Sequence, residues 1–480
     1  MLQKRLIYGT MRFKLITLEA AMFKKLIGDR QFYKKVFALA IPIMIQNGIT
    51  NFVNMLDNIM VGRLSSVEMA GVTISNQLIF VFNICIFGAL AGAGIFGTQF
   101  FGKKDSEGVR FTFRFKIIFA LILTILGVLV LYFCGDSLIN LYLKGEGSAE
   151  DISAAFKYSK DYLNIMLIGF LPFALSQCFG STLRESDQPV IPMVAGIIAV
   201  LVNLTFNYIL IFGHLGAPRL GVCGAAIATV MSRYVELIIV AVWTVIKKAN
   251  NPFIIGAFRS LYVPFHLVRE IFKKGLPLLL NEALWSTGMA ILNQCYSQRG
   301  IDVVSATSIS QTFFNLFGVC FLAIGVEVGI ILGQMLGAGK TQEALDTSYK
   351  LIAFSVLVSI ITGALYAIAA EFIPSFYNVS DNVRHIATAL MQITALVFPL
   401  DAFAHASYFT LRSGGKSFIT FIFDSGFAWL ISVPSAFILT RFTSLSILPI
   451  FAICNGLNIL KCVAGFLFVK SGIWVKNIVN

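Results

Sequence analysis

The sequence from Pro42 to Gly62 reads Pro-Ile-Met-Ile-Gln-Asn-Gly-Ile-Thr-Asn-Phe-Val-Asn-Met-Leu-Asp-Asn-Ile-Met-Val-Gly. It lies in an apolar segment, residues 36–61, that is long enough to cross a bilayer, since a spanning helix needs about 20 residues. Its polar residues recur at steps of three and four and share one helical face: Asn47, Asn51, Asn54, Asp57 and Asn58. An ionisable side chain in a membrane helix is costly and normally faces protein or a water-filled cavity. Asp57 is therefore a candidate functional residue; the alternative is that it caps the helix at the interface, because Gly62 and Arg63 follow closely.

The composition predicts a membrane protein built from helices. Hydrophobic residues make up 57% of the chain, against about 45–50% in soluble proteins, and charged residues 13% against about 25%. A membrane β-barrel would instead show short segments of alternating hydrophobicity. We therefore predict an all-α membrane protein with twelve transmembrane helices, at residues 36–61, 70–100, 117–134, 161–183, 189–213, 221–246, 277–298, 303–336, 350–375, 384–411, 417–440 and 444–469.

Lysine and arginine are distributed unevenly between the connections of these segments. With the N-terminus inside, the cytoplasmic connections hold 27 of them, nine in a basic leader at residues 1–35, and the opposite side holds eight. Cytoplasmic loops are enriched in these residues, so we expect a multi-pass protein of the inner (plasma) membrane with both termini in the cytoplasm. The net charge of +13 then reflects this bias near anionic lipid, and no nucleic-acid partner is expected.

The cysteines and histidines indicate neither a metal centre nor a catalytic one. The eight cysteines lie singly in or near apolar segments, and the four histidines do not cluster. A membrane-embedded enzyme would need a catalytic cluster, and no nucleophile motif occurs. We therefore expect a protein that is not an enzyme.

The two halves of the chain repeat each other. At one constant offset the sequence matches at five places: Pro42 with Pro277, Ile74-Ser75 with Ile309-Ser310, Gly94 with Gly329, Gln99 with Gln334, and Gly102 with Gly337. At a slightly shorter offset, Leu183-Arg184 matches Leu411-Arg412. Each half holds an even number of segments, so the repeats run parallel, which is typical of a transporter with a central cavity between two lobes.

This repeat sets the expected domain organisation. After the leader, residues 36–246 form an N-terminal six-helix lobe and residues 277–470 a C-terminal six-helix lobe. Residues 247–276 form a cytoplasmic linker that contains a short amphipathic piece, residues 268–274, suited to the membrane surface. Residues 471–480 form a cytoplasmic tail.

The motifs together resemble the multidrug and toxic compound extrusion (MATE) family over nearly the whole chain after the leader. The matching stretches are Pro42 with Asp57-Asn-Ile-Met-Val-Gly-Arg-Leu, Gly97-Thr-Gln-Phe-Phe-Gly-Lys-Lys-Asp with its repeat Leu332-Gly-Gln-Met-Leu-Gly-Ala-Gly-Lys, Leu411-Arg412-Ser-Gly-Gly, and Gly221-Val-Cys-Gly-Ala-Ala-Ile-Ala-Thr-Val-Met-Ser-Arg. The resemblance implies a V-shaped, two-lobe antiporter that exports organic, often cationic, amphiphiles while sodium ions or protons enter. It implies no cofactor besides this coupling ion, small-molecule substrates and membrane lipid as partners, and a monomer.

In the N-lobe, the resemblance implies an ion-coupling set led by Asp57. Asn203, Asn207 and Thr229 match the partners of the family's acid, although the family often has Asp where this chain has Asn207. Asn203 and Asn207 are four residues apart and share a helix face. Their alternative role is a hydrogen bond between helices, worth about 0.6 kcal/mol in membranes. We expect the set to bind a proton or one sodium ion, and no other metal.

In the C-lobe, Glu282 and Asp401 match the family's acids. Because two carboxylates attract a cation, we expect Glu282 and Asp401 mainly to contact substrate. Glu327 and Asp424 are further acids within apolar segments. Glu327 stands where the first repeat has Gly92, and neither acid has an assigned role.

A lipid-linked oligosaccharide flippase of the same superfamily is the alternative function. It would line its cavity with several arginines or lysines for pyrophosphate, whereas Arg233 and Lys461 are the two that lie within the apolar segments. A drug-accumulation assay distinguishes the two functions.

Overall fold

The structure is a computed structural model that describes residues 26–479, apart from residues 63, 144–148 and 378. Residues 1–25 of the predicted leader therefore lie outside the described part. Within the described ranges all regular secondary structure is helical, and no strand occurs. The prediction of an all-helical protein is confirmed.

The first six predicted segments lie on seven helices, since the fourth segment is divided between two. These helices are α2 (Arg30–Gly62), α3 (Ser66–Gly102), α4 (Ser106–Tyr142), α5 (Ala149–Ile168), α6 (Phe170–Glu185), α7 (Val190–Phe212) and α8 (Val222–Ile246). The short helix η1 (Pro252–Ile254) follows in the linker.

The last six predicted segments also lie on helices. These are α9 (Phe265–Ser297), α10 (Ile301–Phe317), α11 (Val319–Gly337), α12 (Thr341–Ala370), η2 (Ile373–Phe376), α13 (Asp381–Ser413), α14 (Ser417–Phe421), the π-helical η3 (Ile422–Gly426) and η4 (Ala428–Ser432), α15 (Val433–Phe442), α16 (Ile447–Gly456) and α17 (Asn458–Lys470). Within the described residues, ten helices are long and apolar enough to cross a membrane, or eleven if α5 and α6 form one span.

The pair α5 and α6 shows why one predicted span is broken. The two helices meet at Gly169 and differ in direction by 47°. Pro172 in the first turn of α6 has no N–H to continue the hydrogen-bond ladder from α5. Proline is a recognised cause of a helix kink. The bend therefore follows from local sequence, although the hydropathy pattern shows one continuous segment.

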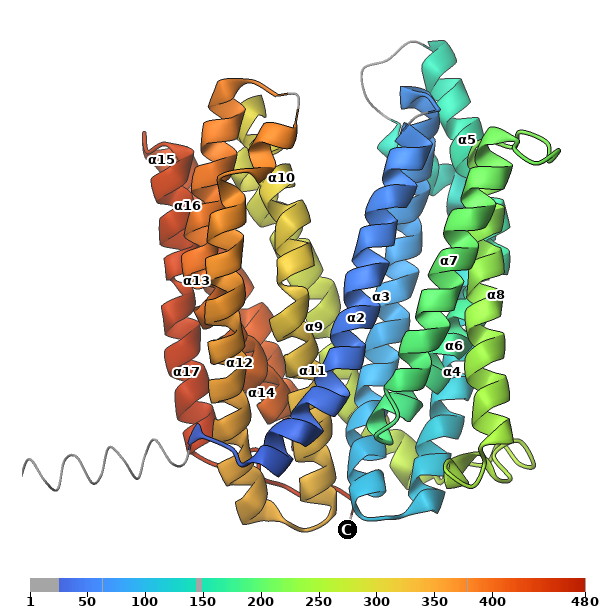
Figure 1. Ribbon diagram of the computed structural model, residues 1–480, viewed down its shortest axis with the longest axis vertical. Helices are drawn as coiled ribbons and strands as arrows, with labels where there is room; N and C mark the ends of the chain where they lie inside the picture. Colours follow the sequence, from blue (N-terminus) through green and yellow to red (C-terminus); the bar gives the residue numbers. More distant parts are fainter. Residues whose placement is uncertain (1–25, 63, 144–148, 378, 480) are drawn as a thin grey trace, which may run out of the picture.

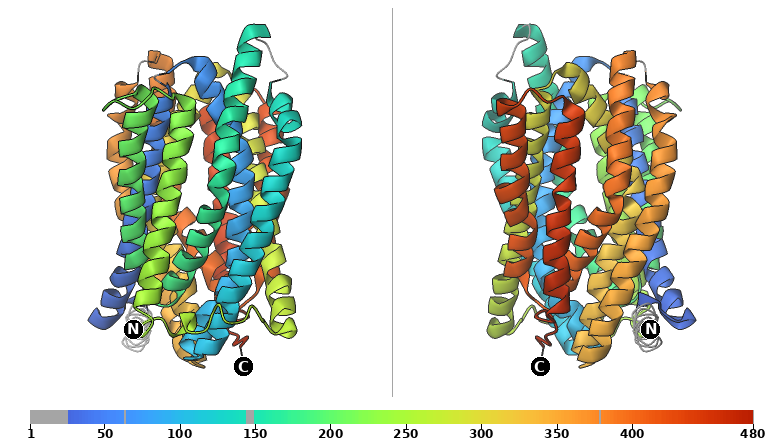
Figure 2. Two further views of the ribbon diagram at one scale, coloured as in Figure 1. Left: turned by 90° about the vertical axis from the view of Figure 1, so that its right-hand side faces the viewer. Right: turned by 90° about the vertical axis from the view of Figure 1, so that its left-hand side faces the viewer.

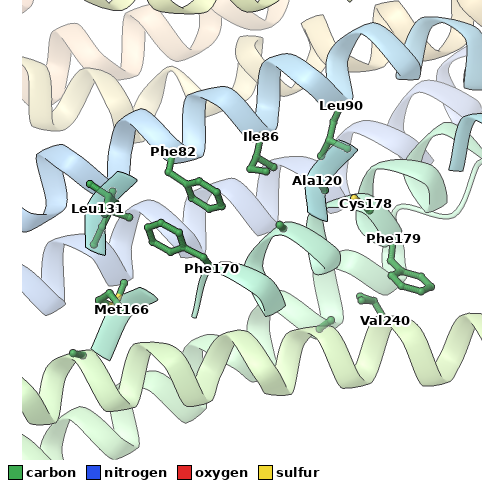
Figure 3. Close-up of a cluster of buried hydrophobic side chains, with 14 of the residues drawn as sticks. Phe82, Ile86, Leu90, Ala120, Leu131, Met166, Phe170, Cys178, Phe179 and Val240 are labelled. Atoms are coloured by element: carbon green, nitrogen blue, oxygen red, sulfur yellow. The ribbon is translucent and has the colours of Figure 1, made fainter. Parts of the chain in front are cut away.

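Each half of the chain has its own apolar core. In the first half, Phe82 of α3 stacks on Phe170 of α6, with ring centroids 4.0 Å apart and planes at 6° (Figure 3). In the second half, Tyr366 of α12 stacks on Phe398 of α13 at 5.2 Å. Close packing makes such cores resistant to deformation. Each half is therefore suited to move as a unit.

Figure 1 shows the two halves as two helical bundles that approach each other at one end and diverge toward the other. The bundles exchange helix ends where they meet. The start of α2 packs on the second bundle, because Val36, Leu39 and Ala40 share a cluster with residues of α11 and α12. The start of α9 packs on the first bundle, where Leu267 and Ile271 join residues of α3 and α4. The amphipathic piece predicted at 268–274 is thus part of α9.

Residues 471–479 lie at the end where the bundles meet (Figure 2). We call this the tail end. It is also the end at which α2 begins.

Candidate functional site

A cavity of about 310 Å³ lies between the two bundles, next to the tail end. Its lining is largely apolar and includes Phe87 of α3 and Phe409 of α13. Four charged side chains also line it: Arg184, Glu185, Glu282 and Arg412. Arg184 and Arg412 are the two repeat-related arginines, so the internal repeat places one guanidinium group from each half at this cavity.

The tail end is closed by a reciprocal crossing of α3 and α11. A Cβ atom added at Gly102 would overlap the carbonyl oxygen of Gln334, and one added at Gly337 would overlap the carbonyl oxygen of Gln99. These are the same glycines and glutamines that match each other in the internal repeat. Only glycine permits backbones to approach this closely. The repeated motifs therefore meet each other across the axis that relates the two halves.

The two glutamine side chains connect the bundles in the same reciprocal way. Gln99 Nε2 donates to the carbonyl oxygen of Ser413 at 2.9 Å, and Gln334 Nε2 donates to that of Glu185 at 3.1 Å. Glu185 and Ser413 directly follow the two matched Leu-Arg pairs, so they too are equivalent positions. Each glutamine thus binds the opposite bundle, and the two helix ends that are bound occupy equivalent positions in the repeat.

Residues 471–479 add a contact that the repeat does not predict. The backbone N–H of Ile478 donates to Gln99 Oε1 at 2.8 Å, and Lys103 Nζ donates to the carbonyl oxygen of Val479 at 2.9 Å. The Trp474 side chain is fully buried. Lys274, near the start of α9, lies close to the tail. Burial lowers the pKa of its ammonium group, the negative charge of Glu270 raises this pKa, and the positive charge of Lys476 in the tail lowers it. The tail is therefore packed between the bundles.

A buried ion pair that the sequence analysis missed lies beside the cavity. Lys116 Nζ is 2.7 Å from Glu185 Oε1, and the two side chains are 0% and 10% exposed. Gly94 provides the space for this carboxylate, because a Cβ there would lie 2.7 Å from Glu185 Oε1. The available signal was a lysine just before the third predicted segment and a glutamate just after the fourth. Such a pair is costly to break, because either partner left alone is an uncompensated buried charge.

The structure brings three of the four N-lobe candidates together. Asn203 Nδ2 donates to Thr229 Oγ1 at 3.2 Å, and Asn207 Nδ2 donates to Asn203 Oδ1 at 3.1 Å. The side chain of Asp57 lies outside the described residues, although its backbone belongs to α2. A Cβ added at Gly196 of α7 would lie 3.4 Å from Gln46 Nε2 of α2.

This contact fixes the register between α2 and α7. The two helices run side by side in the same direction (Figure 1). Asp57 lies eleven residues after Gln46, and Asn207 lies eleven residues after Gly196. Equal numbers of residues give equal rise along two α-helices. The backbone position of Asp57 is therefore within about one helical turn of the level of Asn207.

The two C-lobe candidates occupy different surroundings. Glu282 of α9 lines the central cavity. Asp401 of α13 accepts a hydrogen bond from Asn458 Nδ2 of α17 at 2.9 Å, within the second bundle. Among the described side chains, no hydrogen bond or ion pair joins Glu282 to Asp401.

A second cluster missed by the sequence analysis surrounds Asp424 in the π-helical stretch. Asp424 Oδ1 is 2.6 Å from Lys461 Nζ of α17, and its Oδ2 accepts a hydrogen bond from Asn281 Nδ2 of α9 at 2.9 Å. Asn281 Oδ1 in turn accepts from Ser425 Oγ at 2.7 Å. π-Helical turns are frequent at functional sites. The sequence signal was a pair of opposite charges in the last two apolar segments.

Comparison with known proteins identifies the family of the chain. The family model MatE matches residues 42–209 and again residues 277–438. The two matched stretches begin at Pro42 and Pro277, which are the first matched pair of the internal repeat.

Curated relatives cover nearly the same length. The probable multidrug resistance protein NorM of Thermotoga maritima is 24% identical over 448 residues, which is 93% of this chain and 94% of the relative. The multidrug resistance protein MdtK of Pectobacterium atrosepticum is 26% identical over 407 residues, 85% of this chain and 87% of the relative.

Solved structures show the same fold. One is described as the outward-facing conformation of a multidrug resistance MATE family transporter of the MOP superfamily. It superposes with a TM-score of 0.82 at 20% identity, covering 93% of this chain and 97% of the other. A MOP superfamily transporter from Pyrococcus furiosus, whose binding pocket is described as having reverse polarity, also gives a TM-score of 0.82 at 20% identity, covering 94% and 98%. The chain belongs to the MatE family, the multidrug and toxic compound extrusion transporters.

Proposed function

We propose that this multi-pass inner-membrane protein is an antiporter that exports organic, often cationic, amphiphiles in exchange for sodium ions or protons. The observation that carries the proposal is the cavity between the bundles, closed at the tail end by the reciprocal crossing of α3 and α11. A volume of about 310 Å³ falls at the lower end of the range for small-molecule sites, roughly 300–1,000 Å³. Its apolar lining suits the body of an amphiphile, and Glu282 suits a cationic group.

The charges in the cavity do not favour the flippase alternative. Arg184 and Arg412 would suit a pyrophosphate, but Glu185 and Glu282 line the same cavity. Lys461 is paired with Asp424 at 2.6 Å and lies within the second bundle. A cavity with both signs of charge does not select a multiply charged anion.

For the coupling ion we propose the N-lobe set. Asp57 supplies one formal charge, and Asn203, Asn207 and Thr229 supply neutral oxygens that are already connected to one another. One carboxylate with neutral oxygens suits a proton or a single sodium ion. We propose that Glu282 and Asp401 mainly contact substrate: Glu282 lines the cavity, whereas Asp401 is bound to Asn458 within the second bundle and would have to become accessible.

Transport in proteoliposomes tests these roles. The purified protein is supplied with one cationic and one neutral compound, and either a sodium or a proton gradient is imposed. We expect Asp57→Asn to stop transport of both compounds. Asp401→Asn should weaken transport of the cation more than that of the neutral compound. Asp381→Asn is the control, because this carboxylate is exposed at the start of α13.

Two results would contradict the proposal. Transport of neither compound by the unmodified protein, under either gradient, would remove the antiporter function. Loss of all ion-driven transport in Asp401→Asn, with transport retained in Asp57→Asn, would reverse the assignment of the lobes.

The orientation is also proposed, from the lysine and arginine bias. We expect both termini and the linker to face the cytoplasm. Reporter fusions at Gly256 and after Asn480 should therefore give cytoplasmic signals, and a periplasmic signal at either position would reverse the orientation.

A further inference from the structure

Glu327 of α11 is a buried acid that none of the roles above uses. Its side chain is 0% exposed, and neither carboxyl oxygen has a hydrogen-bond partner within the described part of the chain. An ionised carboxylate in such surroundings is so unfavourable that the group takes up a proton instead. Burial without a partner therefore favours the neutral, protonated form of Glu327.

The internal repeat shows where this carboxyl group lies. The offset that relates Pro277 to Pro42 also relates Glu327 to Gly92 of α3. Gly92 packs against Gly275 of α9, since a Cβ added at Gly275 would lie 3.3 Å from Gly92 Cα. The same offset relates Gly275 to Ala40 of α2, which is 0% exposed. Glu327 thus stands where α2 crosses α11, at a position where the other half of the molecule has only a glycine.

Apolar side chains from both helices surround this crossing. Val36 and Leu39 of α2 form one buried cluster with Ile324, Val328 and Ile331 of α11. Val326, Gly329 and Ile330 line the central cavity from α11, and Glu327 does not. A separation of α2 from α11 would therefore open a path for water to Glu327.

Lys35 of α2 lies one turn before Leu39, on the side of α2 that faces α11. It is exposed, and its Nζ donates to Gln334 Oε1 at 3.3 Å, about two turns along α11 toward the tail end. On the other helices packed on α11, the His405 ring of α13 lies against Gly325, two residues before Glu327. The remaining ionisable groups on these helices near this level or the tail end are Tyr408 and Arg412 of α13, Glu343, Asp346, Tyr349 and Lys350 of α12, and Lys103 directly after α3.

We propose that Glu327 is a proton-binding site that links proton occupancy to the contact between α2 and α11. The proton stays on the carboxyl oxygen while α2 covers it. When the tail end opens, water enters, the O–H bond breaks, and the proton passes to water at the tail end. The carboxylate left behind is then stabilised by hydration and by Lys35. The proposal rests on the proposed antiporter function, for which the closed tail end must open, but it does not require a proton to be the coupling ion.

Infrared spectroscopy tests proton occupancy without any transport. The protein in lipid nanodiscs should show, at neutral pH, the carbonyl stretch of a protonated carboxyl group. Glu327→Gln should lose the intensity of one such group, whereas Glu343→Gln should not, because Glu343 is half exposed and paired with Lys340. An unchanged band in Glu327→Gln would overturn the proposal.

Distance measurements test the link to opening. Spin labels on keto-bearing unnatural amino acids at Ser106 and Thr341, which are equivalent positions of the internal repeat, report the separation of the bundles at the tail end. In the unmodified protein this separation should increase as the pH rises. In Glu327→Gln it should stay short at every pH. Glu327→Gly places at this position the residue that the other repeat has, and it should also lose the pH dependence. Because glycine adds no side chain, this variant shows that the effect of Glu327→Gln does not come from poor packing of the glutamine side chain.

Two outcomes of the distance measurements would overturn the link. One is a pH response in both variants equal to that of the unmodified protein. The other is no pH response in the unmodified protein. Neither outcome depends on substrate, so a failure here is distinct from a failure of the antiporter function.

Discussion

An alanine at Gly102 tests whether the crossing of α3 and α11 holds the tail end closed. The added Cβ would lie 2.6 Å from the carbonyl carbon of Gln334, whereas carbon atoms in contact are about 3.5–4.0 Å apart. The two helices must therefore separate by about 1 Å at this point, and overpacking of this kind costs about 1–3 kcal/mol. Because opening of the tail end releases the strain, the population of the open form should rise roughly 5- to 150-fold.

Hydrogen exchange of residues 471–479, followed by mass spectrometry, measures this change. The backbone N–H of Ile478 is bonded to Gln99 Oε1, so its exchange requires that the tail leave the crossing. In Gly102→Ala we expect exchange of the tail peptide to accelerate by the same factor. Gly456→Ala is the matched control, since nothing lies within 4 Å of a Cβ at that position.

The repeat supplies a second, internal check. Gly337→Ala should have nearly the same effect as Gly102→Ala, because its Cβ meets the backbone of Gln99 in the equivalent way. The double variant Gly102→Ala/Gly337→Ala should destabilise the closed tail end by less than the sum of the two single variants, since the first alanine already separates the helices. Tail exchange in Gly102→Ala equal to that in the control would refute the reasoning, and so would full additivity.

Three further predictions concern the buried polar groups. Lys116→Met should destabilise the protein by about 3–5 kcal/mol, because Glu185 is left as a buried charge. The double variant Lys116→Met/Glu185→Leu should recover most of the loss in the thermal midpoint. An unchanged midpoint in the single variant would show that the pair is not desolvated. Asp424→Asn should lower the thermal midpoint more than the double variant Lys461→Met/Asp424→Asn, since only the single variant leaves an unpaired ammonium group. Equal midpoints of the single and the double variant would argue against a structural role of the pair. Asn203→Leu should cost only about 0.6–2 kcal/mol of stability but abolish ion-driven transport; retained transport would reduce the asparagines to a contact between helices.

Hydropathy and internal repetition were enough to predict the helices and their division into two halves. The matches of Gln99 with Gln334 and Gly102 with Gly337 also predicted equivalent positions, and in the structure Gly102 meets Gln334 as Gly337 meets Gln99. Sequence patterns could not show that contact. Two repeats related by an axis have equivalent residues everywhere, and only the packing decides which of them lie on the axis.

The site was predictable where partners are close in sequence or on neighbouring helices. The resemblance grouped Asn203, Asn207 and Thr229, and hydrogen bonds connect these three side chains in the structure. Their role in ion coupling stays a prediction. Asp424 and Lys461 could not be paired, because their contact depends on how far each helix is rotated about its axis. A π-helical stretch changes that rotation without any signal in the hydropathy.

The crossing at the tail end has the form of a contact between two subunits of a symmetric dimer. Gly102 meets Gln334 as Gly337 meets Gln99, which is how identical protomers associate about a twofold axis. In a true dimer every substitution appears on both sides at once. In a single chain each side varies alone: the tail binds Gln99, while Gln334 binds Lys35 instead. The two halves have therefore been free to become unequal at the place where they touch.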